Sequence, residues 1–171
     1  MAETASGMLN SIGLQGPGIE AFVENDLAWL GSVGARVLVS IAGNTAAEFG
    51  EVAARLADSP AFAAVVGVEV NISCPNVANR GLVFACDPVS SDAVVRLVRD
   101  KLPAATPIFA KLTPDVTDIV TIADAALGAG ADGLTMINTL LGMVIDTDLL
   151  RPQLAGVTGG LSGPAVRPVA V

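Results

Sequence analysis

The sequence predicts an α/β fold in which a parallel β-sheet is covered by helices. Runs of branched apolar residues alternate four times with stretches whose apolar residues recur at helical spacing. Polar residues cluster after several of these runs, where an open α/β sheet or a barrel places its binding site. No Gly-x-Gly-x-x-Gly follows the first run, which favours a barrel over a dinucleotide-binding sheet. We therefore expect a (β/α)8 TIM barrel, of which residues 1–171 form about four β/α units in a single domain.

The opening of the chain is rich in glycine. Residues 6–18 are expected to form a loop, and because Leu9 and Leu14 are apolar, this loop should be partly covered. Apolar residues at helical spacing then predict a helix over residues 19–30.

Four apolar runs have the length and branching of buried strands. They cover residues 36–42, 65–72, 107–112 and 133–138. The first two helices between these strands are marked by capping residues. Asn44 or Thr45 can cap a helix over residues 46–57, and Ser90 or Ser91 can cap the next one.

Thr113 followed by Pro114 combines a capping hydroxyl with the residue preferred at the first helical position. This pair predicts a helix over residues 115–127. After the fourth strand we expect a long loop that runs through residues 159–164, and residues 164–171 resemble the first turn of another helix.

Composition limits the function. Hydrophobic residues make up 52% of the 171 residues, with one Trp, five Phe and no Tyr, so the core must be aliphatic. The net charge of −8 and the lack of a basic cluster make nucleic acid and anionic membranes poor partners. The absence of histidine removes the commonest general base and the usual zinc ligands, and we expect no metal site.

The apolar runs are far shorter than the roughly 18 residues that a membrane span needs. The first residues also lack the basic-then-apolar layout of a signal peptide. We therefore expect a cytoplasmic chain in which Cys74 and Cys86 are free thiols. Half a barrel would leave two unpaired sheet edges and one bare face, so we expect this chain to be a fragment of a protein of roughly 300 residues.

The hexapeptide NISCPN at residues 71–76 follows the second predicted strand. Pro75 cannot donate to a sheet ladder, so the strand should end there and present Cys74 at a loop. A thiol titrates close enough to neutral pH to act as a general base or nucleophile after modest tuning, although an inert buried thiol is the alternative. Without histidine, that tuning must come from a lysine, amide donors or a bound cofactor.

Lys111 stands near the end of the third predicted strand. An ammonium in an apolar strand is costly unless it meets a negative partner or extends to the surface. Asn10, Asn71, Asn76 and Asn138 occupy loop positions. They are either turn formers or a converging set of carboxamides that suits a ligand with alternating carbonyl and amide groups.

Five motifs of this chain occur in the same order in the dihydroorotate dehydrogenases, which the sequence resembles over essentially its whole length. They are GMLNSIGLQ at 7–15, NISCPN at 71–76, AKLTP at 110–114, INT at 137–139 and GGLSGP at 159–164. The resemblance implies an FMN-binding (β/α)8 barrel that oxidises dihydroorotate to orotate in pyrimidine (UMP) biosynthesis. The first motif resembles the NAD-linked class, which implies a homodimer working with an electron-transfer subunit that carries FAD and an iron–sulfur cluster.

The resemblance also implies roles for individual residues. Cys74 would remove a proton from the substrate ring while hydride leaves the neighbouring carbon for FMN. The expected substrate-binding residues are Asn10, Ser11, Ile12, Gly13, Leu14, Asn71, Asn76, Asn138 and Thr139. The expected FMN contacts are Asn71, Lys111, Ile137 and Gly163. Lys111 would lie at the pyrimidine edge of the flavin, where a cation is most useful.

The sequence departs from the family at two positions. Ser40 stands where the family usually has a flavin-contacting Asn, and Gly16 replaces a common Asn in the substrate loop. The family's first strand would precede this chain and its phosphate-binding loops would follow it, so we expect residues 1–171 alone to bind FMN weakly or not at all.

Two alternatives to this function stay open. Dihydropyrimidine dehydrogenase has a similar pyrimidine-reducing barrel, which residues 80–88 slightly favour, whereas Asn76 and residues 7–15 favour dihydroorotate. A non-catalytic fragment that serves as a structural or interaction module is the other alternative.

Overall fold

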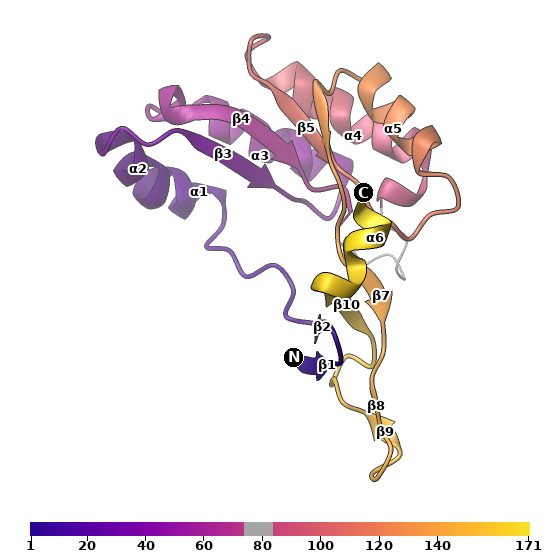
Figure 1. The fold of residues 1–171 in the computed structure, drawn as a ribbon. Helices are drawn as coiled ribbons and strands as arrows, with labels where there is room; N and C mark the ends of the chain where they lie inside the picture. Colours follow the sequence, from indigo (N-terminus) through magenta and orange to yellow (C-terminus); the bar gives the residue numbers. More distant parts are fainter. Residues whose placement is uncertain (74–83) are drawn as a thin grey trace.

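The computed structural model describes residues 1–73 and 84–171. Its larger part is a parallel sheet with the strand order β3-β4-β5-β6, so each strand lies beside the next one in the chain (Figure 1). The strands are β3 (Val37–Ile41), β4 (Val65–Val70), β5 (Ile108–Lys111) and β6 (Gly133–Thr135). All four predicted strands are confirmed. β4 and β6 end earlier than predicted, at Val70 and Thr135.

The helices alternate with these strands as predicted. Residues 19–32 form one helical segment, composed of α1 (Ile19–Ala21), the π-helical η1 (Phe22–Leu27) and α2 (Ala28–Ser32). The other long helices are α3 (Ala46–Ala57), α4 (Pro88–Lys101) and α5 (Ile119–Gly128). Short turns of 3-10 helix lie at η2 (Phe62–Ala64), η4 (Phe84–Cys86) and η5 (Pro164–Val166), and α6 (Arg167–Ala170) follows η5.

One predicted helix cap is confirmed and two are wrong. Thr45 caps α3, since its hydroxyl accepts a hydrogen bond from the Glu48 amide at 3.2 Å. Asp87, not Ser90 or Ser91, caps α4. Asp118 caps α5, so this helix begins at Ile119 rather than near Thr113.

Asp87 and Asp118 cap their helices for the same physical reason, because an aspartate carboxylate can accept hydrogen bonds from two successive helix amides at once. Asp87 accepts from Val89 and Ser90, and Asp118 accepts from Val120 and Thr121. A hydrogen bond from the Thr121 hydroxyl and those from the backbone amides lower the pKa of Asp118. Hydrogen bonds from Ser90 do the same for the pKa of Asp87.

Within residues 1–73 and 84–171, helices cover one face of the parallel sheet and leave the other bare. α3, α4 and α5 pack in sequence behind the strands in Figure 1, and the side chains that face them, such as Val68, Val70 and Ile108, are fully buried. On the opposite face Leu38 is 53% exposed. A doubly wound sheet would carry helices on both faces, so this one-sided arrangement confirms a partial (β/α)8 barrel.

Arg99 of α4 ties together the loops that precede β5 and β6. Its guanidinium donates to the carbonyl oxygens of Thr106 at 2.9 Å and Gly130 at 3.0 Å, and to the carboxylate of Asp132 at 2.6 Å. The same carboxylate accepts from the Ile108 amide at 2.8 Å. These bonds close the end of the sheet opposite the predicted site.

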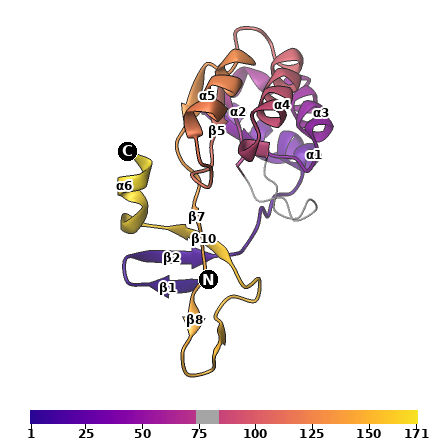
Figure 2. The same ribbon diagram turned by 90° about the vertical axis from the view of Figure 1, so that its right-hand side faces the viewer.

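The smaller part of the molecule is an antiparallel sheet that projects from the α/β layer (Figure 2). Its strand order is β1-β2-β10-β7, and a two-stranded β8–β9 hairpin extends beyond it. The strands are β1 (Ala2–Thr4), β2 (Gly7–Asn10), β7 (Leu140–Gly142), β8 (Ile145–Asp146), β9 (Arg151–Pro152) and β10 (Gly159–Ser162).

This antiparallel sheet overturns two predictions, since residues 6–18 and 159–164 were both expected to be loops. β2 pairs with β10 across most of the chain length, and Leu9 opposite Leu161 shares a small apolar cluster with Leu154. Leu9 is 1% exposed, as a partly covered segment requires, whereas Leu14 is exposed. No helix in the described part of the chain is long and apolar enough to span a bilayer.

Candidate active site

A partly buried hydrogen-bonded network joins the carboxyl ends of β4 and β6. The Asn138 side-chain nitrogen Nδ2 donates to the Ser73 hydroxyl at 2.9 Å and to the Ser73 carbonyl oxygen at 3.2 Å. The Ser73 hydroxyl donates to Asn71 Oδ1 at 2.9 Å, and the Thr139 amide donates to Asn138 Oδ1 at 2.8 Å. Two predicted substrate asparagines that lie far apart in the chain, Asn71 and Asn138, are therefore linked through Ser73.

Lys111 and Asn71 stand side by side at the strand ends. Val70 is paired with Ala110, so the next residues along β4 and β5 are Asn71 and Lys111, and Lys111 is paired with Thr135 on β6. Alternation along the strands places these side chains on the face that helices do not cover. Lys111 is half-buried there, and no ion pair to it is recorded within residues 1–73 and 84–171.

Ser40 lies on the same uncovered face. Its hydroxyl donates to Glu69 Oε1 at 2.9 Å, so its single hydroxyl proton is already used in a hydrogen bond to the neighbouring strand β4. Ser40 can therefore only accept a hydrogen bond from a ligand, whereas the asparagine usual in the family offers both a donor and an acceptor.

Gly160 brings Asn10 and Thr139 together. Asn10 ends β2 and donates from its side chain to the Gly160 carbonyl oxygen at 3.5 Å. On Gly160 a side chain would overlap the Thr139 hydroxyl, because Thr139 packs directly on the glycine backbone. The antiparallel sheet thus carries Asn10 to the end of β6.

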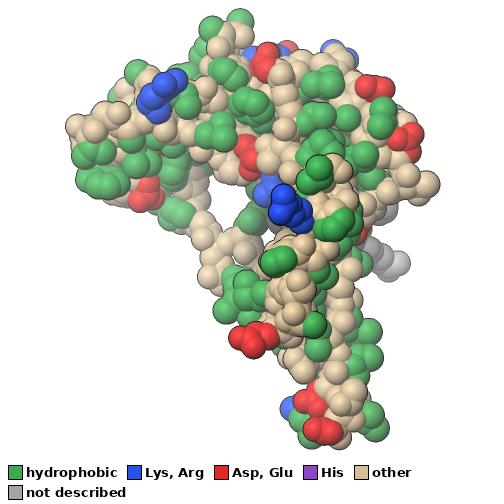
Figure 3. Space-filling view, in the orientation of Figure 1, with side chains coloured by type: hydrophobic (Ala, Val, Ile, Leu, Met, Phe, Trp, Pro, Cys, Tyr) green, Lys and Arg blue, Asp and Glu red, His purple; other side chains and the backbone are tan. Residues whose placement is uncertain are grey.

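The loop that contains Ser11, Ile12, Gly13 and Leu14 is exposed, and it runs between β2 and α1. Its second half lines a cavity of about 520 Å³ together with β3 and Asn71. The space-filling view shows a hollow on this side of the molecule, between the loop, the parallel sheet and the C-terminal segment (Figure 3). Leu14 is the predicted substrate-loop residue that lines this cavity with Asn71.

Ile137 and Gly163 take different positions. Ile137 is half-buried just before Asn138, and its peptide bond to Met136 is cis. Gly163 has a φ of 113°, and a Cβ there would lie 2.6 Å from the Gly7 Cα. The backbone conformation and this close approach each require glycine at position 163. The predicted contacts of Ile137 and Gly163 with FMN remain predictions.

Cys74 and Asn76 lie outside the described residues, and their roles also remain predictions. The described part of the chain contains no cluster of three or more side chains that could hold a metal ion.

The sequence prediction missed Ser73 and Gly160 as members of the site. Ser73 is 3% exposed and bonds to both asparagines. Its place inside the NISCPN motif was the available signal. The sequence shows the Gly159–Gly160 pair, but only the pairing of β2 with β10 in the structure shows what Gly160 contacts.

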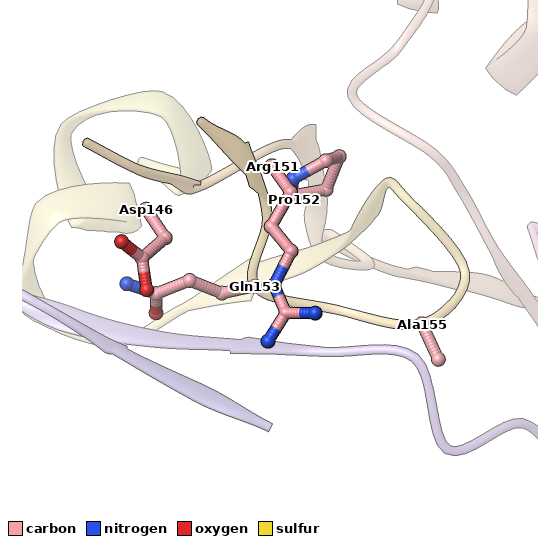
Figure 4. A pocket seen from close by; sticks show the side chains of 5 residues that line it. All are labelled: Asp146, Arg151, Pro152, Gln153 and Ala155. Carbon is pink, nitrogen blue, oxygen red and sulfur yellow. The ribbon is translucent and has the colours of Figure 1, made fainter. Parts of the chain in front are cut away.

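A second cavity, of about 470 Å³, lies on the β8–β9 hairpin. It is lined by Asp146, Arg151, Pro152, Gln153 and Ala155, and the Arg151 guanidinium extends away from the Asp146 carboxylate (Figure 4). Of the predicted site residues that the structure describes, none lines this cavity.

Comparison with known proteins identifies the family of this chain. A family profile described as dihydroorotate dehydrogenase matches residues 1–171. The chain belongs to the dihydroorotate dehydrogenase family. A relative from Geobacter sp. strain M21, "Dihydroorotate dehydrogenase B (NAD(+)), catalytic subunit", is 54% identical over 100% of this chain and 54% of its own length. A protein of the same name from Desulforudis audaxviator is 53% identical over the same shares.

The chain spans about half the length of these curated relatives. Among solved structures, the crystal structure of the Eimeria tenella dihydroorotate dehydrogenase in complex with ferulenol matches with a TM-score of 0.69 and 21% identity. That match covers 94% of this chain and 49% of the other, and it supports the partial barrel.

Proposed function

We propose that residues 1–171 form part of an enzyme that oxidises dihydroorotate to orotate in pyrimidine (UMP) biosynthesis. The observation that carries this proposal is the bonded set of Asn71, Ser73, Asn138 and Thr139 at the strand ends, in a chain that matches the dihydroorotate dehydrogenase family. Carboxamides and hydroxyls in a fixed array suit a ring with carbonyl and amide groups and a carboxylate. Asn10, Asn76 and residues 11–14 would complete the substrate site.

The polar side chains at the strand ends fit FMN. A barrel fills the inner face of its sheet with side chains, and Phe109 packs on Gly133 there, so the planar ring would lie at the carboxyl ends of the strands, beside Asn71 and Lys111. Lys111 would hold the electron-rich edge of the cofactor, and Asn71, Ile137 and Gly163 would contact it. When bound, FMN supplies the acceptor for the hydride that leaves the substrate.

The protein's own part in the reaction is the removal of one proton. Cys74, as thiolate, would take the proton from the ring carbon beside the carbonyl, and the electron pair of that C–H bond becomes part of the new C=C bond. The second hydrogen leaves the neighbouring carbon with its electron pair, as hydride, so orotate has two protons and two electrons fewer than dihydroorotate. The asparagines would orient the ring so that both C–H bonds face their acceptors.

The names of the relatives support a proposal for the onward path of the electrons. They include NAD(+) and "catalytic subunit", which implies a second subunit in those proteins. We propose the same arrangement here: a homodimer of the catalytic chain with a partner that carries FAD and an iron–sulfur cluster and passes electrons to NAD.

The test uses the complete gene product, purified with its partner subunit. Orotate formation from dihydroorotate is followed by absorbance, and uracil reduction is measured in parallel. Turnover of dihydroorotate supports the proposal, whereas turnover of uracil alone would assign the protein to the dihydropyrimidine dehydrogenase type. Absence of both activities would favour the structural module.

Two cysteine variants test the base. Cys74→Ala should abolish oxidation while flavin absorbance is retained. Cys86→Ala is the matched control, because Cys86 is an exposed free thiol and its loss should leave turnover unchanged. Near-normal turnover by Cys74→Ala would exclude Cys74 as the base.

A further inference from the structure

Ser73 lies between the two asparagines that the proposed function uses. It is buried, accepts from Asn138 Nδ2 at 2.9 Å and donates to Asn71 Oδ1 at 2.9 Å. We propose that Ser73 is a positioning residue that decides which end of the Asn71 carboxamide faces the ligand. This inference rests on the proposed function and adds a determinant of specificity to it.

Asn138 sets the donor-to-acceptor direction of the hydrogen bonds in this network. The Thr139 amide can only donate, and it lies 2.8 Å from Asn138 Oδ1. The Ser73 carbonyl oxygen can only accept, and it lies 3.2 Å from Asn138 Nδ2. Both ends of the Asn138 carboxamide are therefore fixed by backbone groups that cannot change their role.

The Ser73 hydroxyl in turn orients the carboxamide of Asn71. Asn138 Nδ2 already supplies a proton to the Ser73 oxygen, so the single hydroxyl proton of Ser73 is directed to Asn71. An N–H group cannot accept that proton, and Asn71 must therefore turn Oδ1 toward Ser73. The ordered series runs from the Thr139 amide through Asn138 and Ser73 to Asn71.

The consequence is that Asn71 offers its Nδ2 donors to the ligand. Asn71 lines the cavity beside β3, and no hydrogen bond from its Nδ2 is recorded in the described residues 1–73 and 84–171. The ligand group that it recognises must be an acceptor, either a ring carbonyl oxygen or an unprotonated ring nitrogen. A ring N–H at that point would meet another donor and be rejected.

Without its hydroxyl, residue 73 could not distinguish the two ends of Asn71. The Asn71 Oδ1 would be left buried without a donor, and the carboxamide would turn to satisfy it at the expense of the ligand. Asn138 would keep its orientation, because the Thr139 amide and the carbonyl of residue 73 still hold it. The expected loss is therefore a loss of ligand binding through Asn71.

The test measures orotate binding by calorimetry to the complete gene product, with thermal melting as a check of folding. Ser73→Ala should raise the dissociation constant about tenfold, equivalent to about 1.4 kcal/mol. Ser73→Cys, of nearly the same size but a weak hydrogen-bonding group, should also weaken binding, and Ser73→Thr should restore most of the affinity. The matched control is Ser91→Ala, since Ser91 is buried and bonds only to the Phe84 carbonyl among the hydrogen bonds recorded for the described residues.

A double-mutant cycle separates a positioning role from a merely structural one. In an Asn71→Ala background, Ser73→Ala should weaken orotate binding by less than about twofold further. Unchanged binding by Ser73→Ala, or the full tenfold loss in the Asn71→Ala background, would overturn the positioning role. If the unmutated protein does not bind orotate, the proposed function fails, and the positioning role fails with it.

Discussion

Gly160→Ala tests whether the antiparallel sheet positions the substrate residues. The added Cβ would overlap the Thr139 hydroxyl oxygen and would lie 2.8 Å from the Thr139 Cβ and 3.3 Å from its Cγ2. Carbon atoms pack at about 3.5–4.0 Å, so Thr139 must move by roughly 1 Å or more. Thr139 is bonded to Asn138 through its amide, and the displacement would therefore pass into the carboxamide network.

A misplacement of about 1 Å in a substrate-positioning residue costs about 100-fold in rate. We therefore expect kcat/KM for dihydroorotate to fall about 100-fold in the complete gene product carrying Gly160→Ala. The melting temperature should fall only slightly, because the glycine lies in a short strand of the smaller sheet and its contact is with a side chain.

Gly128→Ala is the matched control for this substitution. Gly128 ends α5, and a Cβ there would meet no atom within 4 Å, so activity should not change. The reasoning would be refuted if Gly160→Ala kept kcat/KM within about threefold of the unmutated protein, since the overlap would then be absorbed without moving Thr139.

Three further predictions concern stability, measured by urea denaturation of the complete gene product. Arg99→Met removes the donor to three carbonyl oxygens and one carboxylate, and it should lower the free energy of unfolding by about 2–3 kcal/mol. The control Arg96→Met breaks an exposed ion pair and should lower it much less. Equal effects of the two substitutions would contradict the role of Arg99. The folded-state pKa of Asp118 is lowered, so its stabilisation is present above the unfolded value of 3.8 and disappears as pH falls through the folded value. Stability should therefore decline below about pH 4, and Asp118→Asn should flatten that decline; an unchanged pH profile would argue against it. Phe49→Ala, at a ring 1% exposed and packed edge-on against Phe84 at 5.8 Å, should cost about 3–5 kcal/mol, and a loss under about 1 kcal/mol would show that the core refills the space.

The sequence determined the α/β layer because its signals are local. Branched apolar residues predict a strand such as Val37–Ile41. The spacing of apolar residues and the Thr45 cap predict a helix such as Ala46–Ala57. The caps at Asp87 and Asp118 were missed, since a serine or threonine nearby offers the same chemistry and only the path of the backbone selects between them.

Only the tertiary structure decided the antiparallel sheet and the bonded network of the site. β2 and β10 lie in glycine-rich stretches that do not look like strands, and each is stabilised by a partner about 150 residues away, as in the pairing of Leu9 with Leu161. The motifs indicated Asn71 and Asn138 separately. Their shared link through Ser73 depends on where β4 and β6 end in space, and a linear sequence does not record that distance.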